Sequence, residues 1–307
     1  MRLSHLPTIS LAALLLAMPM MSPPATAKDA PAATTAKTLN KARQQARETA
    51  RAKGAKRARE ERTKIFREAV QALLETRKAI AALDKKDKNA ALAALEKVIG
   101  KLEIILARDP KLALAPVDII TYATDIHADV ASVRKAIAKS VELLNGGRVQ
   151  DARAIVSQLA SELVIEITNI PLATYPDAIK AVVPLVEKEE HDKAKEALIA
   201  ALNTLVISRH IVPLPVLRAE ALLAQAETLA QKKERGEKAQ KQLDGLLKAA
   251  RQELQFAEAL GYGKRDDFKG FYRQIDAIER KVAGGKYGTG FFDELKKALA
   301  DFRKKLF

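Results

Sequence analysis

The side chains best suited to chemistry are the histidines and the carboxylates near them. The chain contains four histidines: His5, His127, His191 and His210. Asp118, Asp125 and Asp129 lie seven and four residues apart, so on a helix they would share one face. His127 would point to a different side of that helix. A metal site needs ligands that converge and groups that orient them. We therefore interpret this stretch as an exposed helix face and predict no metal site.

His210 is the candidate pH-sensing residue. The charge of an imidazole changes between about pH 5 and 8, and His210 directly precedes a long apolar stretch, residues 211–233. A catalytic role would need a serine within reach of His210. Ser208 is two residues away and would point elsewhere on a helix. We predict no catalytic residue and no enzymatic activity.

The glycine-rich segment GGKYGTG, residues 284–290, has the composition of a phosphate-binding loop but not its spacing. The G-x-x-x-x-G-K-[ST] pattern is missing, and no strand is predicted before the segment. We predict a turn there and no cofactor. Because the chain has no cysteine, disulfides, thiol nucleophiles and thiolate metal sites are excluded.

Composition favours helices over sheets. Apolar residues make up 48% of the 307 residues and are mainly alanine and leucine, whereas aromatic residues make up 4% and tryptophan is absent. Runs of β-branched residues are short, which also favours helices. The net charge of +15 predicts attraction to anionic partners.

The N-terminus, residues 1–27, has the pattern of a secretory signal peptide. Arg2 gives a positive start, an apolar core follows, and Ala25-Thr26-Ala27 resembles a cleavage site. The apolar core is too short to span a bilayer of about 30 Å as a helix. We expect export to the periplasm and a mature chain that begins near Lys28.

Residues 28–64 are predicted to be a basic flexible arm or a solvated helix. Residues 28–62 carry eleven lysines and arginines against four acids, and Leu39 is the one large apolar side chain. Such a segment lacks the apolar surface to form a core. It is either a solubilising linker or an arm for anionic lipid or lipopolysaccharide. Nucleic acid is disfavoured as a partner, because no aromatic residues alternate with the charges.

Three helical hairpins are predicted after this arm. Each has an apolar residue, seven mainly polar residues and then an alanine that allows two helices to approach closely. The three turns run from Leu83 to Ala91, from Leu144 to Ala152 and from Val186 to Ala194. The second helices are predicted over residues 91–107, 152–168 and 194–208. Pro184 is expected to kink its helix.

Residues 211–233 are predicted to form a buried central helix. Pro215 suits the first turn of a helix, Pro213 precedes it, and apolar residues cover most of the circumference. Another helix, residues 243–260, is expected to end at Gly261 and Gly263, where glycine permits a left-handed cap. The predicted fold class is all-α, a bundle of antiparallel helical hairpins with a central buried helix.

The tail, residues 264–307, holds most of the aromatic residues of the chain. Two helices are predicted, over residues 268–282 and 291–306. They form either a hairpin docked on the bundle or a surface for an apolar or membrane-interface partner.

The runs VPLPVLRAEALLAQAETLAQ and ELQFAEALGYG, with the hairpins and the signal peptide, resemble the YfdX family of bacterial exported proteins. The likeness covers about residues 65–263 and leaves out the arm and the tail. The resemblance implies a helical periplasmic protein linked to acid and other envelope stress. It also implies a chaperone-like or protein-interaction role without an established enzymatic activity or known functional residues.

We therefore expect a non-enzymatic periplasmic stress-response protein. Its partners would be other proteins, either as clients or by self-association, with an anionic membrane surface as a further partner. The alternative is a protein that binds anionic lipid or lipopolysaccharide through the basic arm.

Overall fold

The computed structural model describes residues 30–306, and the side chains of residues 36–306. The predicted signal peptide, residues 1–27, lies outside this part. The described elements are α1 (Ala30–Arg62), α2 (Arg67–Asp84), α3 (Lys88–Arg108), β1 (Leu114–Asp125), α4 (Val130–Asn145), α5 (Val149–Val156), β2 (Ser161–Pro171), α6 (Tyr175–Glu187), α7 (His191–Leu202), β3 (Val206–Pro213), α8 (Leu214–Ala230), α9 (Glu237–Ala259), α10 (Arg265–Val282), η1 (Ala283–Gly285) and α11 (Asp293–Leu306).

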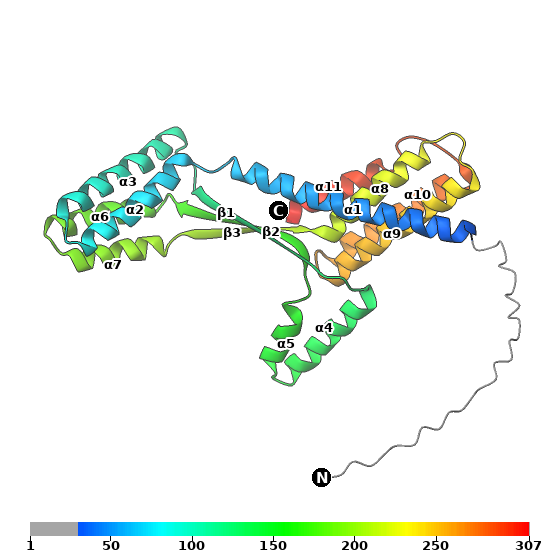
Figure 1. The fold of residues 1–307 in the computed structure, drawn as a ribbon, viewed down its shortest axis with the longest axis horizontal. Helices are drawn as coiled ribbons and strands as arrows, with labels where there is room; N and C mark the ends of the chain where they lie inside the picture. Colours follow the sequence, from blue (N-terminus) through cyan, green and yellow to red (C-terminus); the bar gives the residue numbers. More distant parts are fainter. Residues whose placement is uncertain (1–29, 307) are drawn as a thin grey trace, which may run out of the picture.

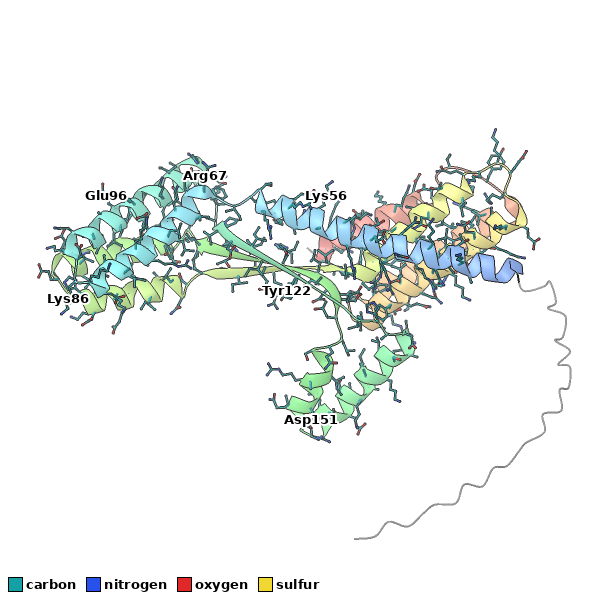
Figure 2. The ribbon with its side chains drawn as sticks, viewed as in Figure 1. Lys56, Arg67, Lys86, Glu96, Tyr122 and Asp151 are labelled. Carbon is teal, nitrogen blue, oxygen red and sulfur yellow. The ribbon has the colours of Figure 1, made fainter. Side chains whose placement is uncertain are left out.

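The molecule is elongated, with helices gathered at its two ends (Figure 1). Helices α2, α3, α6 and α7 form what we call the four-helix lobe. Helices α1 and α8 to α11 form the C-terminal lobe at the other end. A narrow three-stranded sheet runs between the lobes, and the α4–α5 hairpin projects sideways from the sheet. Figure 2 shows Lys86 and Glu96 on the four-helix lobe, Tyr122 on the sheet and Asp151 on the projecting hairpin.

The prediction of a mainly helical protein is confirmed, but the prediction of an all-α fold is wrong. The strands lie in the order β1-β2-β3 and pair antiparallel. Their sequences, LAPVDIITYATD, SELVIEITNIP and VISRHIVP, are rich in β-branched residues, which fit a pleated surface. The overall composition did not predict these strands, because their β-branched runs make up a small part of an alanine- and leucine-rich chain.

The three helix–turn–helix units lie where the sequence placed their turns. The turns between α2 and α3, α4 and α5, and α6 and α7 contain Lys86, Gly147 and Glu189, which all have positive φ angles. Ala91, Ala152 and Ala194 lie in the first turn of the second helices and are at most 1% exposed. The first predicted second helix, residues 91–107, lies within α3, but the other two were predicted too long. Helices α5 and α7 end at Val156 and Leu202, and the chain then enters β2 and β3.

Helix α8 is buried, although it does not lie at the centre of the three hairpins. Eleven of its 17 residues are buried. Seven of them contribute to a core shared with α1, α9, α10 and α11, whereas α2, α3, α6 and α7 surround a separate core. The two cores are separate because the strands carry the chain from one lobe to the other (Figure 1).

The segment predicted to be a flexible arm is, over Ala30–Arg62, a helix packed along the C-terminal lobe. Ala42, Ala46 and Ala50 follow one another at intervals of four residues and are 4%, 0% and 1% exposed. Small side chains at this spacing form a stripe along one helix face that lets a neighbouring helix approach closely. The basic residues occupy the other faces. Counting large apolar residues therefore missed the packing surface of α1.

The tail is docked on the C-terminal lobe through its aromatic residues. Phe268, Phe271 and Phe302 form a cluster of edge-to-face rings with centroids 5.4 to 5.8 Å apart. Each ring is at most 4% exposed. Of the two alternatives for the tail, the structure has the docked hairpin. Across residues 30–306, no helix combines the length and the apolar character that a membrane crossing requires.

Candidate functional site

A buried arginine, Arg218, joins three elements where the sheet meets the C-terminal lobe. It belongs to α8 and is 4% exposed. Its Nη1 donates to Oδ1 and Oδ2 of Asp125 at 2.9 and 3.1 Å, and its Nε donates to Oε2 of Glu253 at 2.8 Å. Asp125 ends β1 and Glu253 lies in α9. The guanidinium thus holds a strand and two helices together through charge-assisted hydrogen bonds.

Ser161 and Tyr262 complete this cluster. The Ser161 hydroxyl donates to Oδ1 of Asp125 at 2.6 Å and accepts from Nη2 of Arg218 at 3.3 Å. The Ser161 backbone N–H donates to the hydroxyl oxygen of Tyr262 at 2.7 Å. Burial raises the pKa of the Tyr262 hydroxyl far above its ordinary value, so the group stays protonated. Tyr262 therefore fastens the turn between α9 and α10 to the start of β2.

The two carboxylates of the cluster have pKa values shifted in opposite directions. Burial alone would raise the pKa of Asp125, but hydrogen bonds from Ser161 and Arg218 outweigh burial and hold this pKa below its usual value. For Glu253, burial is the larger effect and raises the pKa in spite of Arg218. Glu253 is thus the carboxylate that takes up a proton first on acidification.

The cluster contains a carboxylate that can take up a proton, but it contains no activated nucleophile. The Ser161 hydroxyl donates directly to Asp125, and the lowered pKa of Asp125 makes it a poor base. A nucleophilic serine needs a base whose pKa lies near the working pH. The geometry instead fits a structural clamp that contains one proton-accepting carboxylate, Glu253.

An open groove of about 790 Å³ lies beside the clamp. Arg43 and Arg47 of α1, His127 and Asp129 before α4, and Glu253 are among the residues that line it. Nη2 of Arg43 also donates to Oε1 of Gln252 at 2.7 Å. The groove carries charges of both signs, so its electrostatics select neither anions nor cations.

The three aspartates considered for a metal site do not share a helix face. Asp118 and Asp125 lie on strand β1, and the Asp118 carboxylate accepts from the N–H of Ile119 at 2.8 Å. Asp129 caps α4 by accepting from the N–H of Ser132 at 2.7 Å. The prediction that these aspartates share a helix face was wrong because residues 114–125 form a strand. Within residues 30–306, no group of three histidine, aspartate or glutamate residues is placed to hold a metal ion.

His210 lies on the edge strand β3, opposite Ile165 of β2, and is half-buried. Ser208 is on the same strand, and its Oγ accepts from Nδ2 of Asn169 at 3.1 Å. Residues 206–213 thus form a strand and not the helix end that the sequence predicted there. A pH-sensing role for His210 stays a prediction.

The residues singled out for structural roles all lie at element boundaries. Pro213 caps α8 with an extended backbone, and Pro215 lies in its first turn. Gly261 has a φ of +80° just after α9. The N–H groups of Gly261 and Tyr262 donate to the carbonyls of Glu258 and Ala257, at 3.0 and 3.1 Å, which is a Schellman cap.

Gly263 is needed for a close approach to the aromatic cluster. A Cβ at this position would lie 2.6 Å from the ring of Phe302 and 3.2 Å from Phe268. The run AEALGYG thus combines a helix cap, the Tyr262 contact to β2 and a glycine that leaves space for Phe302. This explains how that run positions α10 and α11.

Sequence reasoning missed Arg218, although the signal was present. Residues 211–233 are expected from the sequence to be buried on nearly all sides, and Arg218 lies in their first half. A charge inside a buried helix needs a partner of opposite charge. Its partners, Asp125 and Glu253, are 93 and 35 residues away in sequence, so only the fold identifies them.

The α4–α5 hairpin carries a row of exposed apolar side chains. They are Ile137, Val141, Leu144, Val149 and Val156, with exposures between 36% and 53%. Ile137, Val141 and Leu144 follow the i, i+4, i+7 pattern of one helix face. We call these five residues the apolar row. The hairpin contacts the rest of the described chain mainly through α4 and α9, which leaves the row uncovered.

Comparisons with known proteins found matches to the middle part of the chain, which includes the α4–α5 hairpin. A family model described as YfdX protein matches residues 72–211. The match ends three residues before α8, so it includes the α4–α5 hairpin and nearly all of the four-helix lobe and the sheet. No curated protein matches the chain. A solved structure of Salmonella Typhi YfdX is 14% identical, with a TM-score of 0.34, and the alignment covers 49% of this chain and 93% of that chain.

Proposed function

Because a model of the YfdX family matches residues 72–211, we propose that this chain is a non-enzymatic periplasmic stress-response protein that binds other proteins in a chaperone-like manner. The binding surface is the apolar row on the α4–α5 hairpin. Location in the periplasm is supported by the signal-peptide pattern of residues 1–27.

The single observation that carries this proposal is the uneven distribution of exposed apolar side chains. Of the thirteen large apolar residues that are exposed in the described chain, five belong to the apolar row. Single exposed apolar residues are normal, whereas a contiguous group marks an interaction site. An amphipathic helix face binds apolar segments of partners through anchors spaced three or four residues apart.

The test compares two triple variants in suppression of aggregation. V141S/L144S/V149S removes three members of the row, and L74S/I104S/I199S removes three residues of similar exposure from the four-helix lobe. Light scattering of an acid-treated client protein is followed with each variant. We expect the first variant to lose suppression and the second to retain it. Equal suppression by both, or no suppression by the unchanged protein at any ratio, would contradict the proposal.

A second candidate, binding to anionic lipid or lipopolysaccharide, is favoured by the charges of α1. Several exposed cations of this helix form no ion pair with a described residue: Lys37, Lys41, Arg43, Arg47, Arg51, Arg59 and Arg62. Removing residues 28–62 is a poor test, because Ala42 and Ala46 belong to the core of the C-terminal lobe. The variant K37Q/K41Q/R51Q keeps the packing and removes charge, and it should weaken sedimentation with anionic vesicles.

A further inference from the structure

Two connecting segments meet at one corner of the C-terminal lobe. One is the turn from α8 to α9, and the other is the loop from α10 to α11. Arg235 of the turn donates from Nη2 to the carbonyl of Val282 at 3.2 Å and from Nη1 to the carbonyl of Ala230 at 2.8 Å. The N–H of Gly288 donates to the same Ala230 carbonyl at 3.3 Å. These bonds fix the two segments side by side.

Exposed cations without acidic partners gather at this corner. They are Lys232, Lys233, Arg280, Lys281 and Lys286, which we call the basic corner. None of the five forms an ion pair with an acid among residues 36–306. Glu234 is the one acid of the turn, and Glu279 of α10 faces Arg251 of α9 instead. Many other cations of the lobe, such as Lys296, are paired with carboxylates.

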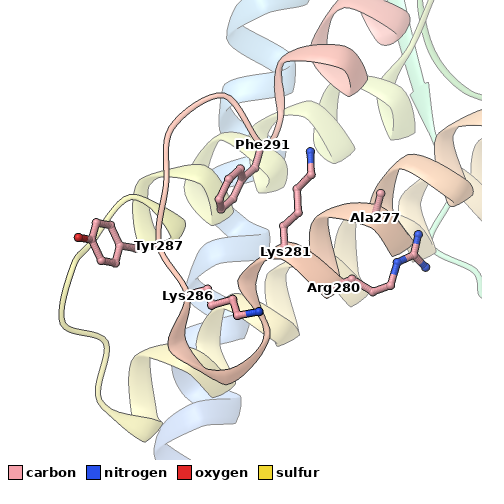
Figure 3. A pocket seen from close by; sticks show the side chains of 6 residues that line it. All are labelled: Ala277, Arg280, Lys281, Lys286, Tyr287 and Phe291. Carbon is pink, nitrogen blue, oxygen red and sulfur yellow. The ribbon is translucent and has the colours of Figure 1, made fainter.

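Aromatic side chains border the same cations (Figure 3). A wide-open pocket of about 690 Å³ lies between the end of α10 and the loop, and Lys281, Lys286, Tyr287 and Phe291 are among its lining residues. The Nζ of Lys281 lies 5.6 Å from the centroid of the Phe291 ring. Figure 3 shows the Tyr287 ring turned outward from the loop, and this side chain is 51% exposed. An exposed tyrosine beside lysines is the combination found at membrane–water interfaces, where the ring lies at the level of the headgroups.

We propose that the basic corner binds the phosphate groups of an anionic lipid surface, with Tyr287 at the headgroup level. This inference rests on the anionic-surface candidate and gives it a site other than the middle of α1. Lipid is favoured over nucleic acid because the aromatic side chains occupy one loop and form no track along which successive bases could stack. Helix α1 begins at the same end of the molecule (Figure 1).

The test measures sedimentation with vesicles that contain phosphatidylglycerol, with vesicles of phosphatidylcholine alone as the neutral reference. The full mature chain is compared with K281Q/K286Q and with the matched control K85Q/K97Q, which removes two exposed, unpaired lysines from the four-helix lobe. We expect K281Q/K286Q to weaken binding to the anionic vesicles by roughly 10- to 30-fold. The control should bind like the unchanged protein. Y287S should also weaken binding, and at high salt its loss should persist while that of K281Q/K286Q shrinks.

The outcomes separate this inference from the candidate function on which it rests. If the unchanged protein does not bind anionic vesicles, both are overturned. If it binds them and K281Q/K286Q binds equally well, the assignment of the binding site to the basic corner is wrong, and anionic-surface binding remains as a candidate function. Two further arms test the source of the phosphate. Inorganic phosphate that competes fully at constant ionic strength, or single-stranded DNA bound as tightly as the vesicles, would overturn the assignment to lipid.

Discussion

Nη1 of Arg218 lies 2.9 and 3.1 Å from the two carboxylate oxygens of Asp125, although 93 residues separate them in sequence. One partner comes from the mainly apolar helix α8 and the other from the last residue of β1. Since Glu253 takes a further bond from the same guanidinium, one side chain links the sheet to the C-terminal lobe.

Removing the charge of Asp125 should destabilise the protein strongly. Asp125→Asn leaves the buried Arg218 with Glu253 as its one remaining carboxylate, and breaking one side of a buried pair costs about 3 to 5 kcal/mol. We expect a loss near the lower end of this range, because the asparagine oxygen still accepts a hydrogen bond. Urea unfolding at pH 7 measures it. Glu253→Gln is the control and should cost less, because burial already disfavours the charged form of Glu253. Equal losses would contradict this account of the clamp.

The clamp should be most stable in mildly acidic solution. The raised pKa of Glu253 means that its contribution to stability is present below its unfolded value of 4.5 and is lost as the pH rises through the folded pKa. The lowered pKa of Asp125 has the opposite sign. Its contribution is present above 3.8 and is lost as the pH falls through the folded pKa. Between these limits both contributions are present.

The difference in free energy of unfolding between the unchanged protein and Glu253→Gln isolates the first effect. We expect this difference to shift in favour of the unchanged protein as the pH falls from 7 toward 4.5. Urea titrations across that interval measure it. A constant difference would show that Glu253 does not gain its proton there.

Replacing Gly263 by alanine should destabilise the C-terminal lobe by about 1 to 3 kcal/mol, the usual cost of overpacking a core. The added Cβ would press against Phe302 and Phe268. Thermal unfolding measures the loss. The matched change Gly270→Ala meets no atom within 4 Å and should not lower the melting temperature.

Enlarging the alanine stripe of α1 should release the helix from the lobe. Ala46→Leu adds volume where the side chain is fully buried, so we expect a cost of about 1 to 3 kcal/mol and faster proteolysis within α1. Ala52→Leu, on an exposed face of the same helix, is the control. If Ala46→Leu is cleaved no faster than this control, α1 is not held by its alanines.

His210 remains to be tested as a pH sensor. Protonation at mildly acidic pH would place a charge on the half-buried edge strand β3, which should change stability or self-association between pH 7 and 5. His210→Gln should abolish that change. If unfolding and oligomerisation respond to pH identically in both proteins, the residue has no such role.

The features that the sequence predicted well are those decided by neighbours along the chain. The hairpin turns beside Ala91, Ala152 and Ala194 follow from local polarity and one small residue, and Pro215 marks the start of α8. The strands were missed because a strand is stabilised by residues far away in sequence, as with Ile119 opposite Ile167. The same holds for the candidate site, since the role of Arg218 depends on its ion pairs with Asp125 and Glu253, which are distant in sequence.

The two sequence runs that carry the resemblance to the YfdX family lie beyond position 211, whereas the family match covers residues 72–211. Those later residues, among them Gly261 and Gly263, position the helices of the C-terminal lobe. The apolar row lies inside the matched part, and the basic corner lies outside it.

The position of α1 has a consequence for how the chain matures. This helix is made early, yet its docking partners are made late: Arg43 bonds to Gln252, 209 residues further on. Until α8 is made, the alanine stripe has no surface to cover it, and the dense positive charge keeps the segment in water and apart from its copies. The C-terminal lobe can close only after α11 has been made, and such distant contacts form slowly. Closing α1 onto α8 and α9 is therefore a late step, and a chain truncated before α8 would leave its first helix without its main docking partners.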